Sequence, residues 1–215
     1  KYFGIVVSII LLLYQKPVFA YDSYNNYVYN NDGTQQLEPQ AYVPYRIITG
    51  ESIGTDSLLS PKDVFVAENG EIYICDTGNN RILILNSNLV LTKVIESFFN
   101  NGVEDTFNEP TGLVVSGENL IYIADSLNGR IVVLDEEGKL EKIYYKPQSE
   151  LLSGNFEYVP VKVAIDSGNR IYIISKGETQ GIIQLSREGE FFGFFGAIHT
   201  SPSFLNSLIR RFGTE

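Results

Sequence analysis

The sequence is poor in the residues that build covalent and metal-based chemistry. Its 215 residues include one cysteine, Cys75, and one histidine, His199, with no methionine and no tryptophan. A single cysteine forms no internal disulfide and no thiolate metal site, and a single histidine excludes a histidine-rich zinc site. Ser-His-Asp catalysis would need His199 as its base, and the Gly-x-Ser-x-Gly turn is absent from the sequence.

Positive charge is also scarce. The chain has 16 basic and 26 acidic residues, a formal net charge of -10. Because phosphate groups need clusters of lysine and arginine, this balance argues against nucleic acid and against an anionic membrane surface as partners. The acidic charge indicates either a neutral or cationic partner or simply solubility, and a protein and a small-molecule or carbohydrate ligand both stay open as partners.

Two segments precede the main body of the sequence. Residues 1–20 have a basic start, an apolar run of about ten residues and small side chains at Val18 and Ala20, the pattern of a signal peptide. An uncleaved membrane anchor is the alternative, although a spanning helix needs about 20 apolar residues. Residues 21–44 alternate tyrosine and asparagine, which predicts a linker. We therefore expect a secreted or cell-surface-anchored protein.

The rest of the chain contains an internal repeat. Pro61, Pro110 and Pro160 begin three copies, and Ile-Tyr-Ile recurs at 72–74, 121–123 and 171–173. In the first two copies ten of 26 aligned positions are identical over 61–86 and 110–135. A period of 40–50 residues is typical of solenoids and propellers. The copies predict repeats over about 61–109, 110–159 and 160–200.

The pattern of short strands favours a propeller over a solenoid. Each copy has three short apolar runs separated by turn residues, followed by a more polar fourth segment. The run Ile82–Leu85 is apolar on both faces, as expected for a strand buried between neighbouring sheets. The sequence therefore predicts an all-β chain with four-stranded antiparallel propeller blades, about three of them, over residues 45–200. In particular, Ile72–Cys75 should pair with Ile82–Leu85.

The residues that end the second strand resemble a known family. Asp76-Thr-Gly-Asn-Asn-Arg-Ile82 and Asp125-Ser-Leu-Asn-Gly-Arg-Ile131 are similar to the NHL repeat, and the flanking pattern resembles exported bacterial proteins of that class. The third copy departs from it with Ser175-Lys-Gly-Glu-Thr-Gln-Gly. The resemblance implies a propeller that is commonly six-bladed. Propellers of this family occur in ligand- and protein-binding modules, in extracellular sensor domains and in a few enzymes.

The ends of the repeat region do not close a ring. Because a closed ring needs at least four blades, we expect the chain to be a fragment that lacks about half of it and exposes one whole blade face. Residues 46–49 are predicted to give the outer strand of the last blade. Apolar residues at helical spacing over 203–212 predict an inserted helix that begins in 201–215 and packs on the third blade, a partner-binding helix being the alternative.

The repeat signature supplies the candidate site residues. An aspartate at the end of a strand accepts backbone N–H bonds and holds a turn, and an arginine nearby pairs with it within or between blades. These side chains would line one rim, where loops gather, and could also contact a ligand. The signature residues are Asp76, Asn79, Arg81, Asp125, Asn128 and Arg130.

No dense metal motif accompanies them. The acids available as ligands are Asp63, Glu68, Glu71, Glu109 and Glu118. In gluconolactonase-like propellers, inner-strand acids hold a metal, but the equivalent positions here are Asp63, Gly112 and Lys162. We predict no catalytic residue and no cofactor, with calcium or another divalent ion as the alternative. Cys75 lies in mid-strand and is predicted to be a core residue.

Together these features favour an exported propeller that binds a ligand or protein on its loop face, rather than an enzyme. The alternative is a metal-dependent lactonase-like or lyase-like enzyme on the same scaffold.

Overall fold

In a computed structural model, the structure describes residues 27–37, 46–152, 157–178 and 181–196. Apart from three single 3-10 turns, the regular elements in these ranges are β-strands. Within them, no helix has the length and apolar character needed to cross a membrane. The predicted signal or anchor segment, the predicted helix in 201–215 and His199 lie outside the described residues.

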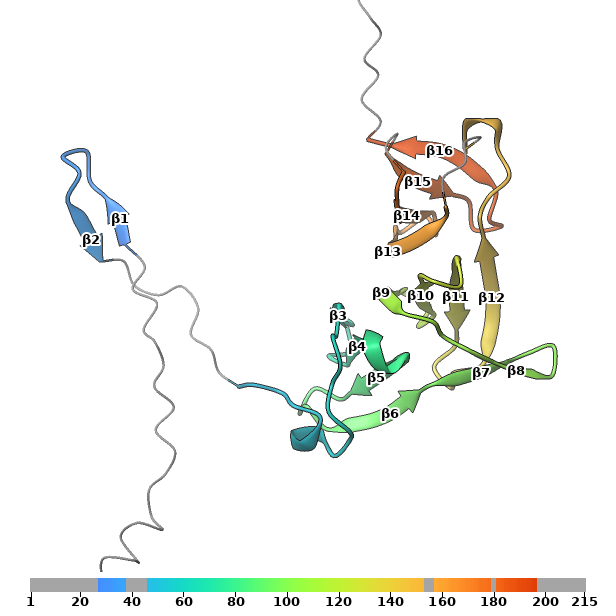
Figure 1. The fold of residues 1–215 in the computed structure, drawn as a ribbon, viewed down its shortest axis with the longest axis horizontal. Helices are drawn as coiled ribbons and strands as arrows, with labels where there is room; N and C mark the ends of the chain where they lie inside the picture. The colour runs from blue at the N-terminus through green and yellow to red at the C-terminus, as the bar shows by residue number, and fades with distance from the viewer. Residues whose placement is uncertain (1–26, 38–45, 153–156, 179–180, 197–215) are drawn as a thin grey trace, which may run out of the picture. The chain divides into compact units, whose positions relative to one another are not determined.

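Three four-stranded sheets follow one another along the chain (Figure 1). Each sheet runs in sequence order from its first strand to its fourth, and we call the sheets blades 1, 2 and 3. Blade 1 contains β3 (Asp63–Val66), β4 (Ile72–Asp76), β5 (Arg81–Leu85) and β6 (Leu91–Ile95). Blade 2 contains β9 (Pro110–Val115), β10 (Ile121–Asp125), β11 (Arg130–Leu134) and β12 (Leu140–Tyr145). Blade 3 contains β13 (Val159–Ile165), β14 (Ile171–Lys176), β15 (Ile182–Leu185) and β16 (Phe191–Phe195).

The strand pairing follows the predicted order. In β4 and β5, Ile72 lies opposite Leu85 and Cys75 lies opposite Ile82, so the predicted pairing is confirmed. All pairs within the three blades are antiparallel. These connections give a partial β-propeller with an all-β fold.

Alternate residues of each strand face opposite neighbours. In β10, Ile121 and Ile123 belong to the apolar cluster with blade 1, whereas Tyr122 and Ala124 belong to the cluster with blade 3. All four side chains are buried. Because both faces of the strand are covered, the sequence has apolar residues at consecutive positions.

A short hairpin between blades 1 and 2 was not predicted. β7 (Ser97–Asn100) pairs with β8 (Val103–Thr106), directly after the outer strand of blade 1. Phe98 and Phe107, on either side of its turn, are buried in the cluster between the two blades. The hairpin thus fills the gap where blade 1 leads into blade 2.

The face of blade 1 that points away from blade 2 is partly covered by the residues that precede it. Ile48, Ile53 and Leu58 pack against Leu83 and Leu85, which are fully buried. The expected exposure of one whole blade face is therefore not found on this face, because the 48–58 segment shields the outer part of it. The inner strand of the blade is less shielded, since Val64 and Val66 are 60% and 61% exposed. On blade 3, Ile174, Phe192 and Phe195 are 46%, 71% and 57% exposed.

Two other sequence predictions concern the segment before blade 1. Residues 46–49 are described but form no strand, so the expected outer strand for a last blade is not observed. Within the predicted linker 21–44, β1 (Tyr27–Tyr29) and β2 (Gln35–Leu37) form a hairpin. Its turn contains Asp32, whose carboxylate accepts the Thr34 backbone N–H at 3.0 Å, and Gly33 at a φ of 78°.

Candidate functional site

The first signature aspartate joins three parts of blade 1. Asp76 is fully buried at the end of β4. One carboxylate oxygen accepts the Leu59 backbone N–H at 2.7 Å, and the other accepts Asn79 Nδ2 at 2.8 Å and Arg81 Nε at 2.7 Å. Since each bond reaches a different segment, the carboxylate fixes the chain before the blade, the loop after β4 and the start of β5 together.

The second repeat makes the same contacts. Asp125 is also fully buried, and it accepts the Asn108 backbone N–H at 2.7 Å. Its other oxygen accepts Asn128 Nδ2 at 2.9 Å and Arg130 Nε at 2.8 Å. Buried charged groups are tolerated when they are paired and hydrogen-bonded in this way. The predicted pairing of aspartate with arginine is present within each of these two blades.

The loops explain the rest of the signature. Asn80 has a φ of 53° and Gly129, at the matching place, has a φ of 61°. Asparagine and glycine tolerate this left-handed region better than other residues. In blade 3 the aspartate is replaced by Ser175, whose hydroxyl accepts the Val159 backbone N–H at 3.1 Å. The serine thus keeps one of the three bonds that the aspartates make.

The two arginines differ in their outer nitrogens. Arg130 Nη1 and Nη2 donate to both carboxylate oxygens of Asp105, at 2.7 and 2.8 Å. This bidentate bond raises the pKa of Arg130 and lowers the pKa of Asp105. Arg81 Nη2 donates only to the Asp56 backbone carbonyl, at 3.2 Å. Arg81 Nη1 lies 3.8 Å from Glu96 Oε1, which is beyond hydrogen-bonding distance.

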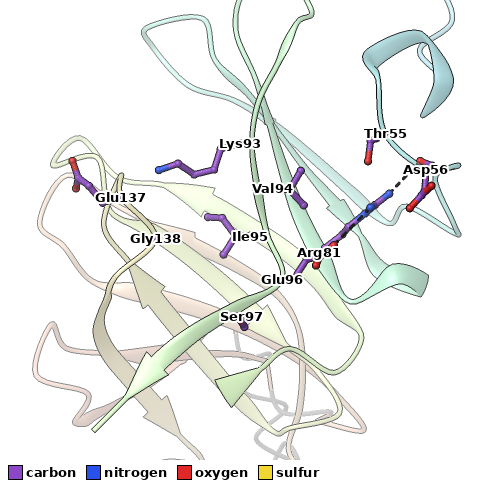
Figure 2. A pocket seen from close by; sticks show the side chains of 10 residues that line it. All are labelled: Thr55, Asp56, Arg81, Lys93, Val94, Ile95, Glu96, Ser97, Glu137 and Gly138. Carbon is purple, nitrogen blue, oxygen red and sulfur yellow. Dashed lines mark hydrogen bonds and ion pairs between the residues drawn. The ribbon is translucent and has the colours of Figure 1, made fainter. Parts of the chain in front are cut away.

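Arg81 lies in the wall of a groove beside blade 1 (Figure 2). The groove has a volume of about 650 Å³ and runs along the open edge of β6. Its lining contains two basic and three acidic side chains. We call it the Arg81 groove; its lining residues are Thr55, Asp56, Arg81, Lys93, Val94, Ile95, Glu96, Ser97, Glu137 and Gly138.

A matching groove beside blade 2 lacks the arginine. It has a volume of about 520 Å³ and is lined by the outer strand of blade 2 and the turn of blade 3. Lys142 in this groove donates to the Arg187 and Glu188 carbonyls, and Lys93, its counterpart in blade 1, donates to the Glu136 carbonyl. Arg130, the counterpart of Arg81, is not among its lining residues.

Asp63, Gly112 and Lys162, which occupy the metal-ligand positions of gluconolactonase-like propellers, lie close together on the inner strands. The Lys162 ammonium forms an ion pair with Asp63, whose other oxygen accepts the Leu113 backbone N–H at 2.8 Å. A Cβ atom on Gly112 would lie 2.6 Å from the Val161 carbonyl oxygen, so the strands approach closely there. Among the described residues, no three histidine, cysteine, aspartate or glutamate side chains are grouped as a metal site.

Cys75 has the character of a core residue. Its side chain is fully buried between blades 1 and 2, and this burial raises the pKa of its thiol. A thiol with a raised pKa is protonated at neutral pH and is a weak nucleophile.

Sequence reasoning missed Asp56 and Asp105 as members of the site. Both lie before the aligned part of their repeats, which began at Pro61 and Pro110. Extending the spacing of 49 residues backwards places Asp56 on Asp105. That identity was the signal that could have joined each aspartate to its arginine.

Comparisons with known proteins agree with the repeat. Residues 58–85 and 107–134 match the family model of the NHL repeat. No curated protein matches the chain. Among solved structures, the chain is similar to the hydrazine synthase of Kuenenia stuttgartiensis, with 11% identity and a TM-score of 0.50 over 73% of this chain and 40% of that one. It is also similar to selenomethionine-substituted virginiamycin B lyase from Staphylococcus aureus, with 16% identity and a TM-score of 0.47 over 81% of this chain and 49% of that one.

This chain spans less than half the length of either structure. At these identities the likeness concerns the fold alone. The matched segments each contain the Asp-Asn-Arg signature whose contacts are described above. The chain carries two NHL repeats within a partial β-propeller.

Proposed function

We propose that this chain belongs to an exported, non-enzymatic propeller that binds an extended segment of a protein partner in the Arg81 groove. The signature aspartates are buried, and their carboxylates are engaged with their own blades. The surface open to a partner lies instead in the groove beside them. The proposal applies to the described propeller region, and secretion or anchoring through residues 1–20 is part of it.

The observation that carries the proposal is the position of β6 in the groove. β6 pairs with β5 on one side only, and residues 93–97 line the groove as a continuous stretch. An open strand edge presents unpaired backbone N–H and C=O groups, which an extended peptide can bind as an added strand. Charged side chains around the groove would then select among peptides.

No observation among the described residues favours the alternative of a metal-dependent lactonase or lyase, since no group of three potential ligands is present there. A small-molecule or carbohydrate ligand remains the alternative occupant of the groove. Such a ligand would use its walls without needing the strand edge.

A random-peptide phage library tests this proposal on the full chain. Wild-type protein should enrich peptides, and Val94→Arg, which places a bulky side chain in the groove, should reduce capture about tenfold or more. Val103→Arg is the matched control, because Val103 is exposed but outside the groove lining. Equal capture by both variants, or no enrichment by wild-type protein, would contradict the proposal.

A further inference from the structure

Two arginines occupy the same place in two repeats, and only one of them has a complete set of partners. Arg81 and Arg130 each donate through Nε to the buried aspartate of their own blade. Arg130 then binds the Asp105 carboxylate with both outer nitrogens. Arg81 has no such partner, because its bond to the equivalent residue, Asp56, goes to the backbone carbonyl.

The pair between Arg130 and Asp105 shows which chemical group could bind the outer nitrogens of Arg81. A guanidinium presents parallel N–H donors in a rigid plane, and a carboxylate accepts two of them at once. In repeat 2 that geometry is realised with donor–acceptor distances of 2.7 and 2.8 Å. Because the two repeats hold the base of the arginine in the same way, the outer edge of Arg81 is preset for the same partner.

Arg81 borders a groove that a ligand could enter. Arg81 is only 5% exposed, yet it lines the Arg81 groove, and Figure 2 shows its guanidinium extending toward Asp56 at one end of the groove. The groove beside blade 2 does not include Arg130 in its lining. Of these two arginines, Arg81, whose outer nitrogens hydrogen-bond no carboxylate, lines the groove beside its blade, and Arg130 does not.

We propose that Arg81 binds a carboxylate of the peptide held in the groove, with Nη1 and Nη2 as donors. This inference rests on the proposed function. The carboxylate comes either from an aspartate or glutamate side chain or from the C-terminus of the peptide. The groove also contains Asp56, Glu96 and Glu137. Asp56 and Glu137 suit neutral or basic residues on either side of the carboxylate, whereas Glu96 competes with it for Arg81.

The first test uses a peptide enriched by the wild-type chain and measures its affinity by calorimetry. Three synthetic forms are compared: the parent, a form with each aspartate or glutamate changed to its amide, and a form with an amidated C-terminus. Loss of the carboxylate that Arg81 binds should weaken affinity about tenfold or more, and the form affected identifies its source. Equal affinities would overturn this inference while leaving groove binding intact. Failure to enrich any peptide would instead overturn the proposed function.

A second test leaves Arg81 in place, since this residue also braces Asp76. Glu96 is exposed and lies near Arg81 Nη1, so Glu96→Gln removes a competing negative charge. Affinity for the parent peptide should rise about two- to fivefold, and affinity for the affected neutral form should stay constant. Glu51→Gln, an exposed acid outside the groove lining, is the control and should change neither. Unchanged affinity in Glu96→Gln, or the same change for both peptide forms, would overturn the proposal.

Discussion

Each signature aspartate connects three segments of its repeat through one buried carboxylate. Asp76 and Asp125 bind an N–H from the segment before their blade, an asparagine in the loop and an arginine on the next strand. Because the carboxylates are buried, removal of Asp76 would leave Arg81 without its hydrogen-bonded charge partner, which costs about 3–5 kcal/mol in buried pairs. Arg130 would keep its pair with Asp105 if Asp125 were removed. The main role of the signature aspartates is therefore to stabilise the blade, since their carboxylate oxygens are already hydrogen-bonded within it.

The pair between Arg130 and Asp105 predicts a pH-dependent contribution to stability. Arg130 lowers the pKa of Asp105 below its ordinary value of 3.8, so the folded state holds this carboxylate charged to lower pH than the unfolded chain does. The contribution is present above that ordinary value and is lost as the pH falls through the folded pKa. Asp105→Asn should lower the free energy of unfolding by about 1–2 kcal/mol at pH 7.

Denaturant titrations over a range of pH would measure this effect, which should shrink toward zero in acid. Asp56→Asn is the matched control, since it changes the equivalent residue, whose backbone carbonyl rather than its carboxylate binds the arginine. An equal loss of stability in the two variants, or a loss in Asp105→Asn that persists at low pH, would show that the carboxylate pair is not responsible.

Residue patterns alone predicted part of this site. A strand-ending aspartate with an arginine five residues later indicated a pair, and that pair is present in both copies. The sequence did not predict which arginine has a carboxylate on its outer nitrogens. That difference depends on Asp105 and Asp56, which lie 25 residues before Arg130 and Arg81. The sequence gives these two aspartates the same spacing, and only the folded lead-in segments distinguish a carboxylate partner from a carbonyl partner.

At the scale of strands, alternation and turn residues predicted the blades well. The three copies place apolar runs where β4, β10 and β14 form. The β7–β8 hairpin was missed because it occurs between blades 1 and 2 and has no counterpart among the described residues between blades 2 and 3. Residues 46–49 were predicted as an outer strand because they match the fourth-strand position of the first copy, near Val94 and Ile95. They form no strand here, since a strand also needs a partner edge, which a sequence match cannot supply.

Close approach of the inner strands predicts a glycine requirement. Gly112→Ala should lower the free energy of unfolding by about 1–3 kcal/mol, because the added Cβ would meet the Val161 carbonyl and the Lys162 backbone on blade 3. Gly117→Ala is the control, since a Cβ there meets nothing within 4 Å. Thermal unfolding of the two variants would compare them, and equal melting temperatures would contradict the observed strand spacing.

At the scale of the whole molecule, charge and fold give different kinds of information. The net charge of -10 argued for a neutral or cationic partner, yet the Arg81 groove contains basic side chains that a summed charge conceals. Neither the repeat nor the composition could predict this groove. It is assembled from residues 55–56 before blade 1, the edge of β6 and the turn at 137–138 in blade 2.

The most direct test of peptide binding in this groove is hydrogen–deuterium exchange of the full chain with and without an enriched peptide. Strand addition to β6 would protect backbone amides over 91–97, and contact with the blade 2 turn would slow exchange over 136–138. Protection should be concentrated in these two segments. Protection confined to the inner strands, such as 63–66, would contradict it and place the partner elsewhere on the propeller.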